Sequence, residues 1–192
     1  MEDGGLAEHR ARLLEGLSGE VLEVGAGNGM NFRHYPPSVT RVLAVEPEPY
    51  LRRQAQRNAA EAGVPVEVVD GVAGELPVPD RSYDAVVCSL VLCSVPDQRA
   101  ALVDVRRALR RGGELRFFEH VVSPGRPLAT VQRALDATVW PLVAGGCHAA
   151  RDTASAIEAA GFELVELDRF RFPAGPVPAP TAPHILGRAV LR

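Results

Sequence analysis

The chain has 192 residues, of which 46% are hydrophobic and 23% charged, and it carries a formal net charge of −3. This length and apolar share suit one domain with a core of its own, and the near-neutral charge argues against nucleic acid as a partner. All 21 lysine-or-arginine positions hold arginine, which excludes Schiff-base chemistry, a lysine general base and a P-loop.

Strand and helix patterns alternate through the first half of the chain. Residues 1–18 contain a short amphipathic helix, and a helix between Pro49 and Gly63 has proline at its start and glycine past its end. A shorter helix is expected over residues 31–35. The predicted strands are continuous β-branched runs, which is typical of a sheet that helices cover on both faces. They span residues 20–24, 41–45, 64–69 and 83–89.

The alternation continues to the end of the chain. A helix begins at residues 94–97 and ends before Gly112, and residues 173–183 hold five prolines that exclude regular structure. Further strands are predicted at 114–120, 162–168 and 185–191, and further helices at 126–143 and 152–160. The sequence therefore predicts an α/β fold, a Rossmann-like doubly wound sheet in a single domain of residues 1–192.

The first strand runs into a glycine turn, Glu23-Val-Gly25-Ala-Gly27-Asn-Gly29. In a doubly wound sheet, ligands bind beyond the carboxyl ends of the strands, where the strand order reverses. A dinucleotide fingerprint of the form G-x-G-x-x-G/A needs a small residue at position 30, which is Met30 here. The spacing is instead G-x-G-x-G, with an acid two residues before the first glycine.

The acid in this turn indicates the charge of the ligand. A pyrophosphate is disfavoured beside Glu23, whereas a ligand with a primary ammonium and a cationic sulfur is favoured, and S-adenosylmethionine has both. Glu46, 21 positions after Gly25, ends the second strand and is placed to accept hydrogen bonds from both ribose hydroxyls. Charge-assisted bonds of this kind contribute roughly 1.5–3 kcal/mol each.

Other residues are predicted to line the same cofactor site. The segment Val72, Ala73 and Gly74 is expected along the adenine edge, with Cys88, Ser89 and Leu90 across from it. Three further residues close in sequence to the glycine turn or to Glu46 are also predicted to bind the cofactor: Ala26, Asn31 and Pro47.

These motifs resemble those of the class I S-adenosylmethionine-dependent methyltransferases, of the type 11 or UbiE-like group. The chain is most similar to the membrane-associated alkyl-thiol methyltransferases of mammals and their bacterial relatives, over about Val21 to Val190. The matching segments are 27–37, 90–95, 111–113, 119–121, 146–147, 151–153 and 183–187. The resemblance implies a mostly parallel sheet with a C-terminal antiparallel strand, and S-adenosylhomocysteine as the product. Two departures are the absence of an apolar N-terminal anchor and Val72 at a position where many members have an acid.

Two histidines are the catalytic candidates. His120 ends a central strand and is a candidate general base, with cofactor-loop packing as an equally good interpretation, and His148 lies beside Cys147. A thiol acceptor, with a pKa near 8.5 against about 10 for a phenol, needs little activation. Zinc sites usually have four well-placed ligands, so Cys88 and Cys93 are interpreted as buried thiols and no metal is predicted.

The sequence thus predicts methyl transfer to a small-molecule acceptor, with a thiol as the leading candidate. Oxygen or nitrogen methylation of a small metabolite or natural product remains an alternative, as do a nicotinamide-dependent oxidoreductase and a non-catalytic cofactor-binding protein. Three cysteines are too few for a disulfide framework, which predicts a reducing compartment, the cytoplasm. No signal peptide or membrane-spanning run is visible, so a soluble protein without a membrane anchor is expected.

Overall fold

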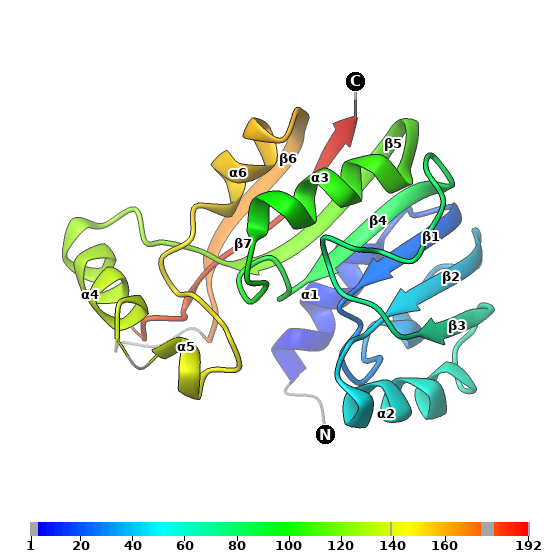
Figure 1. Ribbon diagram of the computed structural model, residues 1–192, viewed down its shortest axis with the longest axis horizontal. Coiled ribbons are helices and arrows are strands. Elements are labelled where there is room, and N and C mark those ends of the chain that lie inside the picture. The colour runs from blue at the N-terminus through cyan, green and yellow to red at the C-terminus, as the bar shows by residue number, and fades with distance from the viewer. Residues whose placement is uncertain (1–3, 139, 174–178, 192) are drawn as a thin grey trace.

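A seven-stranded sheet organises the computed structural model, which describes residues 4–138, 140–173 and 179–191 (Figure 1). The strands follow the spatial order β3-β2-β1-β4-β5-β7-β6. They are β1 (Gly19–Val24), β2 (Val39–Val45), β3 (Val66–Val69), β4 (Tyr83–Ser89), β5 (Leu109–His120), β6 (Phe162–Arg171) and β7 (Pro183–Leu191).

Helices cover both faces of this sheet, as the continuous apolar strands predict. Leu13 and Leu14 of α1 and Ala55 of α2 are buried against one face, while Leu102 of α3 and Ile157 of α6 are buried against the other. The helices are α1 (Gly4–Leu14), η1 (Phe32–His34), α2 (Pro49–Ala59), α3 (Gln98–Ala108), α4 (Arg126–Asp136), α5 (Trp140–Val143) and α6 (Thr153–Ala159).

Strand order reverses between β1 and β4, where the chain departs from one half of the sheet to build the other. The pairs β1–β2, β1–β4 and β4–β5 are all parallel. Val24 lies in register with Val45 on one side and Cys88 on the other. The carboxyl ends of these central strands therefore meet at one edge of the sheet, which is where ligands bind in this architecture.

The C-terminal antiparallel strand is confirmed. β7 runs antiparallel to both of its neighbours, β5 and β6, and pairs His184 with His120 at the carboxyl end of β5. Because β7 lies between β5 and β6, His184 reaches the same edge of the sheet as His120, although the two are more than sixty positions apart in sequence.

The predicted helix over residues 126–143 is wrong in one respect, because it is two helices. The chain leaves α4 after Asp136, and the hydroxyl of Thr138 donates to the carbonyls of Ala134 and Leu135 at 3.1 and 2.9 Å. Pro141 lacks the amide hydrogen that a continuous helix would need. α5 then begins at Trp140 as a separate short helix.

The other predicted elements are present with shifted ends. β5 begins at Leu109, five residues before the predicted Glu114, and β6 extends beyond Asp168 to Arg171. Leu109 pairs with Tyr83 of β4 at this earlier start, and Arg110 next to it forms ion pairs with Glu20 of β1 and Asp84 of β4. In the proline-rich segment, residues 174–178 lie outside the described residues.

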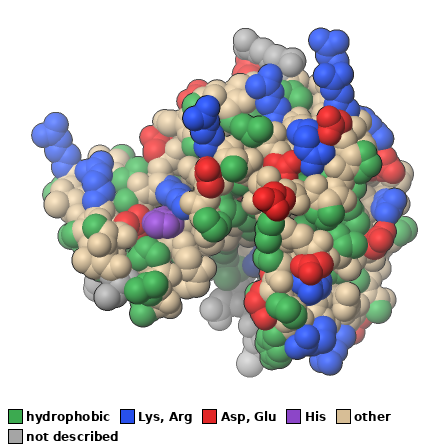
Figure 2. Space-filling model, viewed as in Figure 1, with side chains coloured by type: hydrophobic (Ala, Val, Ile, Leu, Met, Phe, Trp, Pro, Cys, Tyr) green, Lys and Arg blue, Asp and Glu red, His purple; other side chains and the backbone are tan. Residues whose placement is uncertain are grey.

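α4 and α5 stand beyond the carboxyl ends of β4 and β5, apart from the layers on the sheet (Figure 1). The space-filling view shows this lobe beside the rest of the molecule with a notch between them (Figure 2). Gln132 of α4 is fully buried and anchors the lobe. Its side-chain nitrogen donates to the carbonyls of Val121, Ala149 and Pro180 at 2.7–3.1 Å, and its oxygen accepts from the amide of Ser123.

In the described part of the chain, no helix combines the length and the apolar character that crossing a bilayer requires.

Gly187 of β7 sets a packing constraint that can be tested. A Cβ there would overlap the carbonyl oxygen of Glu166 and lie 2.7 Å from Cζ of Phe117. We expect Gly187→Ala to lower the free energy of unfolding by about 1–3 kcal/mol through overpacking, measured by thermal and denaturant unfolding. Gly63→Ala is the matched control, because a Cβ at Gly63 meets no atom within 4 Å. Equal stability of the two variants would contradict the prediction.

Candidate active site

The glycine turn after β1 has the backbone conformation that its sequence demands. Gly25, Gly27 and Gly29 have φ of +66°, +57° and +82°, which L side chains rarely adopt. A Cβ on Gly25 would come within 2.5 Å of Val91, so glycine lets the turn pack against the loop after β4. A Cβ on Gly27 would meet nothing within 4 Å, and the turn is therefore open above this residue.

Glu46 at the end of β2 lies directly against this turn. Its two carboxylate oxygens accept hydrogen bonds from the amides of Gly27 at 2.7 Å and Glu48 at 2.9 Å. The residue is only 5% exposed. Arg52 of α2 donates to the carbonyls of Glu46 and Pro47, so the acid sits on a fixed backbone at the carboxyl edge.

Glu23, near the end of β1 and just before the glycine turn, is buried. Asn31 and Tyr35 each donate to one of its oxygens at 2.7 Å, and Arg10 of α1 donates to Asn31 at the same distance. Burial raises the pKa of Glu23 to about 7, although the hydrogen bonds from Tyr35 and Asn31 and the charge of Arg10 oppose this rise. Both oxygens thus face protein groups, and any contact with a cofactor ammonium would be made through this network.

The segment predicted beside the adenine is arranged unevenly. Val72 is 47% exposed and pairs with Glu75 in an isolated bridge, whereas Ala73 packs partly against the core. Gly74 has φ of +100°. This stretch follows β3 at the carboxyl edge, and Gly74 lies beside Ala100 of α3.

The residues predicted across from the adenine also differ in their surroundings. The Cys88 side chain is fully buried in the core, so this residue would reach a ligand only through its backbone. Leu90 has φ of +61°, a strained value for a side chain with a Cβ. Its amide donates to the carbonyl of Phe118 at 2.7 Å, and Arg10 approaches the hydroxyl of Ser89 at 3.5 Å.

His120 lies at the carboxyl end of β5 and its Nδ1 is 3.2 Å from the sulfur of Cys147. The ring also meets that of His184 edge-on, with centroids 4.5 Å apart. Burial lowers the pKa of His184 to about 4, so this neighbour is a neutral imidazole at pH 7.

His148 is oriented differently from His120. Its amide donates to the carbonyl of Cys93 at 2.8 Å, while its ring lies 3.7 Å from a carboxylate oxygen of Asp136. The structure therefore gathers Cys93, His120 and Cys147 at one place, with His148 next to them in the chain. Catalytic roles for the two histidines stay predictions.

Glu119 is the acid at this edge to which the sequence pattern alone assigns no role. Its carboxylate is fully buried and accepts three backbone hydrogen bonds, from the amides of Val91, Leu92 and Cys93 at 2.9–3.0 Å. Burial raises its pKa well above the usual range, while the three amides oppose this rise. The sequence signal for Glu119 is an acid next to His120 at a predicted strand end. Its hydrogen-bond partners could not be predicted from this signal, because they are 26–28 residues away in the sequence.

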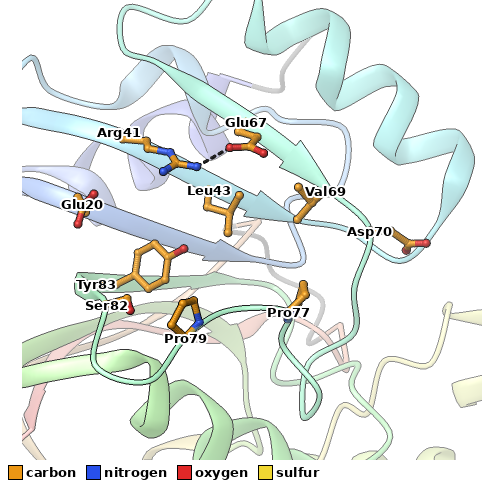
Figure 3. Close-up of a pocket in the computed structure, with 10 residues that line it drawn as sticks. All are labelled: Glu20, Arg41, Leu43, Glu67, Val69, Asp70, Pro77, Pro79, Ser82 and Tyr83. Carbon is orange, nitrogen blue, oxygen red and sulfur yellow. Dashed lines mark hydrogen bonds and ion pairs between the residues drawn. The ribbon is translucent and has the colours of Figure 1, made fainter.

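A cavity of about 430 Å³ lies beside β2 and β3 (Figure 3). It extends from Glu20 and Tyr83, near the amino ends of their strands, to Val69 and Asp70 at the carboxyl end of β3. None of the predicted cofactor or catalytic residues lines it. The chemistry is therefore expected at the carboxyl edge and not in this cavity.

Comparison with known proteins shows the family of this chain. Residues 22–117 match the family described as "Methyltransferase domain". A thiol S-methyltransferase, TMT1B of Rattus norvegicus, is 40% identical over 187 residues, covering 92% of this chain and 73% of that protein. The chain belongs to the methyltransferase domain family.

Other relatives and solved structures support the same fold. The human thiol S-methyltransferase TMT1A is 38% identical over 181 residues, covering 91% of this chain and 72% of that protein. The YcgJ protein of Bacillus subtilis superposes with a TM-score of 0.75 at 18% identity, covering 98% and 99% of the two chains. A geranyl diphosphate methyltransferase, solved in complex with SAM, gives 0.73 at 15% identity, covering 98% and 85%.

This methyltransferase uses S-adenosylmethionine as its cofactor. The residues present fit that group, because the turn is open above Gly27 and the carboxylate of Glu46 reaches the turn at the end of the neighbouring strand. When bound, the cofactor supplies an electrophilic methyl group on a cationic sulfur. The protein's own residues supply alignment and an acceptor site.

The raised pKa of Glu23 predicts a pH-dependent stability of the cofactor-free protein. Glu23 ionises near pH 4.5 in the unfolded chain and near 7 in the folded one, so the unfolded state loses its proton first. The free energy of unfolding therefore falls as pH rises from about 4.5 to 7, by about 3 kcal/mol from this group. Glu23→Gln should remove this decline in urea unfolding measured between pH 4.5 and 8.

The exposed Glu61→Gln controls for the change in net charge, and it should keep the wild-type pH dependence. An identical pH profile for wild type and Glu23→Gln would show that Glu23 is not the group that titrates in this window.

Proposed function

We propose that this enzyme transfers the methyl group of S-adenosylmethionine to the sulfur of a small thiol. The observation that carries the proposal is the 40% identity, over 92% of the chain, to a protein named as a thiol S-methyltransferase. The carboxyl end of β5, which we call the acceptor side of the edge, also supports the proposal. Sulfur and imidazole groups lie close together there, at Cys93, His120 and Cys147.

The reaction itself is an in-line displacement. A lone pair on the acceptor sulfur forms the new S–C bond, the methyl–sulfonium bond breaks, and its electron pair stays on the cofactor sulfur. The acceptor proton leaves to solvent or to a base. A thiol ionises near pH 8.5 and thus needs less help than a phenol. We place the acceptor in the notch between the sheet edge and the α4–α5 lobe (Figure 2).

The cytoplasm is the proposed compartment, because a reducing environment suits three free cysteines. The proposed partner is the small-molecule acceptor alone, without nucleic acid.

Activity should be measured as S-adenosylhomocysteine release, with mass spectrometry of the methylated product, for a panel of small thiols, phenols and amines. We expect turnover with thiols and a thioether product. Turnover with phenols or amines only would favour oxygen or nitrogen methylation. Cofactor binding by calorimetry without any turnover would favour a non-catalytic cofactor-binding protein.

Glu46 is proposed to bind the ribose hydroxyls. Glu46→Gln replaces a carboxylate by an amide, and loss of charge-assisted hydrogen bonds should weaken S-adenosylhomocysteine binding at least about 10-fold in calorimetry. Glu67→Gln is the control, because Glu67 is an exposed glutamate of β3 that pairs with Arg41 beside the cavity of Figure 3. Unchanged affinity in Glu46→Gln would exclude Glu46 from the cofactor site.

A further inference from the structure

Three side chains of types that can bind a metal ion come from distant parts of the chain and meet at the acceptor side of the carboxyl edge. They are Cys93 in the turn after β4, His120 at the end of β5, and Cys147 in the loop after α5. Their sulfur and nitrogen atoms all lie within 4.8 Å of one another, and Cys147 Sγ is 3.2 Å from His120 Nδ1. We call these three residues the Cys-His-Cys cluster.

The spacing of the cluster suits one tetrahedral ion. Zinc binds cysteine sulfur at about 2.3 Å and histidine nitrogen at about 2.0–2.1 Å, so two of its ligand atoms are separated by roughly 3.6–3.8 Å. The measured distances, 3.2 Å between His120 and Cys147 and at most 4.8 Å between any two of the three, bracket that separation. Catalytic zinc sites have three protein ligands and leave the fourth position for a water or a substrate, and two cysteines with one histidine is a known set.

We propose that Cys93, His120 and Cys147 bind one zinc ion, and that the acceptor thiol occupies its fourth position. The identity of the fourth ligand rests on the proposed function, whereas the zinc site itself does not. Thiolate is a ligand that zinc prefers, and the acceptor proton is released to solvent when the sulfur binds the ion. The resulting sulfur lone pair then attacks the methyl carbon as written above, and a neutral thioether leaves.

The backbone around both cysteines is fixed in advance. The Glu119 carboxylate binds the amide of Cys93, and the amide of His148 donates to the carbonyl of Cys93 at 2.8 Å. Gly146, with φ of +84°, brings the second loop close, since a Cβ there would lie 3.0 Å from the carbonyl oxygen of Ser94. Such preorganisation is typical of metal sites and lowers the cost of bringing two thiolates together.

The charges around the cluster suit two thiolates and a divalent cation, which together are neutral. Arg151 is partly buried and donates to the carbonyl of Leu92 at 2.6 Å, on the loop that carries Cys93. Its positive charge lies near both cysteines and near Glu119. His184 packs edge-on against the His120 ring, and its own ring is oriented by a hydrogen bond from Nδ1 to the carbonyl of Ala182.

This proposal departs from the sequence-based expectation of no metal. That expectation paired Cys93 with Cys88, its nearest cysteine in sequence, and required four protein ligands. The fold buries Cys88 in the core and brings Cys147 and His120 to Cys93 instead. A ligand role for His120 also replaces its role as general base, because Nδ1 is then held by the ion.

The test uses the full chain, purified without chelators. Bound zinc is measured by mass spectrometry of the metal, and Co²⁺ is used as an optical probe of thiolate ligation. We expect one ion per chain in the wild type. Cys93→Ser, Cys147→Ser and His120→Ala should each lower the affinity for Co²⁺ at least about 100-fold, beyond the effect of losing an outer contact. Cys88→Ala and His148→Gln are matched controls that should keep the ion.

Protection of Cys93 and Cys147 from alkylation by added zinc is measured on the wild type, so the result does not depend on how well a variant folds. Protection of both cysteines supports the site. No bound ion, equal affinity in all variants, or a Cys93–Cys147 disulfide that forms in the presence of zinc would overturn it.

Activity separates this proposal from the proposed function. Thiol methylation that persists undiminished in metal-free protein would overturn the role of the ion as the acceptor's ligand. Bound zinc together with methylation of phenols or amines only would instead overturn the thiol acceptor and leave the site standing. Loss of thiol methylation on metal removal, with S-adenosylhomocysteine binding intact and activity restored by zinc, supports both.

Discussion

The turn after β4, next to the carboxyl end of β5, depends on one buried carboxylate. Glu119 lies at the end of β5 with no exposed surface, and it holds the amides of three consecutive residues, Val91 to Cys93. A buried charge is stable only when hydrogen bonds or opposite charges compensate it, and this turn supplies three donors. The carboxylate in turn fixes the turn after β4, which packs against Gly25 and carries Cys93. Glu119 thereby fixes the position of Cys93 relative to the glycine turn at Gly25.

Three acids near the carboxyl ends of β1, β2 and β5 stabilise different parts of this edge. Glu23 of β1 is bound by Asn31 and Tyr35 and supports the turn from below, Glu46 of β2 lies against Gly27, and Glu119 orders the loop after β4. All three are nearly or completely buried. Parallel strands make this possible because their carboxyl ends meet at a single edge. The geometry of this edge is therefore set by hydrogen bonds from backbone amides to Glu46 and Glu119 and from side chains to Glu23.

The fold, and the meeting of the glycine turn with Glu46, could be predicted from local patterns. Gly25, Gly27 and Glu46 carry their signal in spacing, because a turn and an acid at a strand end have meaning without distant contacts. The Cys-His-Cys cluster could not be predicted in this way, since Cys93 and Cys147 lie 54 positions apart and meet only through packing. The break between α4 and α5 was missed because the apolar spacing continues across it, while Thr138 and Pro141 end the helix.

The attachment of α4 through Gln132 has a consequence for how the acceptor side can diversify. One amide side chain holds the helix to three separate backbone segments, so it works as a clasp whose register must be kept. Leu142 and Val143 of α5, in contrast, are largely exposed. Substitutions at these two positions can therefore reshape the surface of the lobe while the strands and the cofactor turn stay untouched.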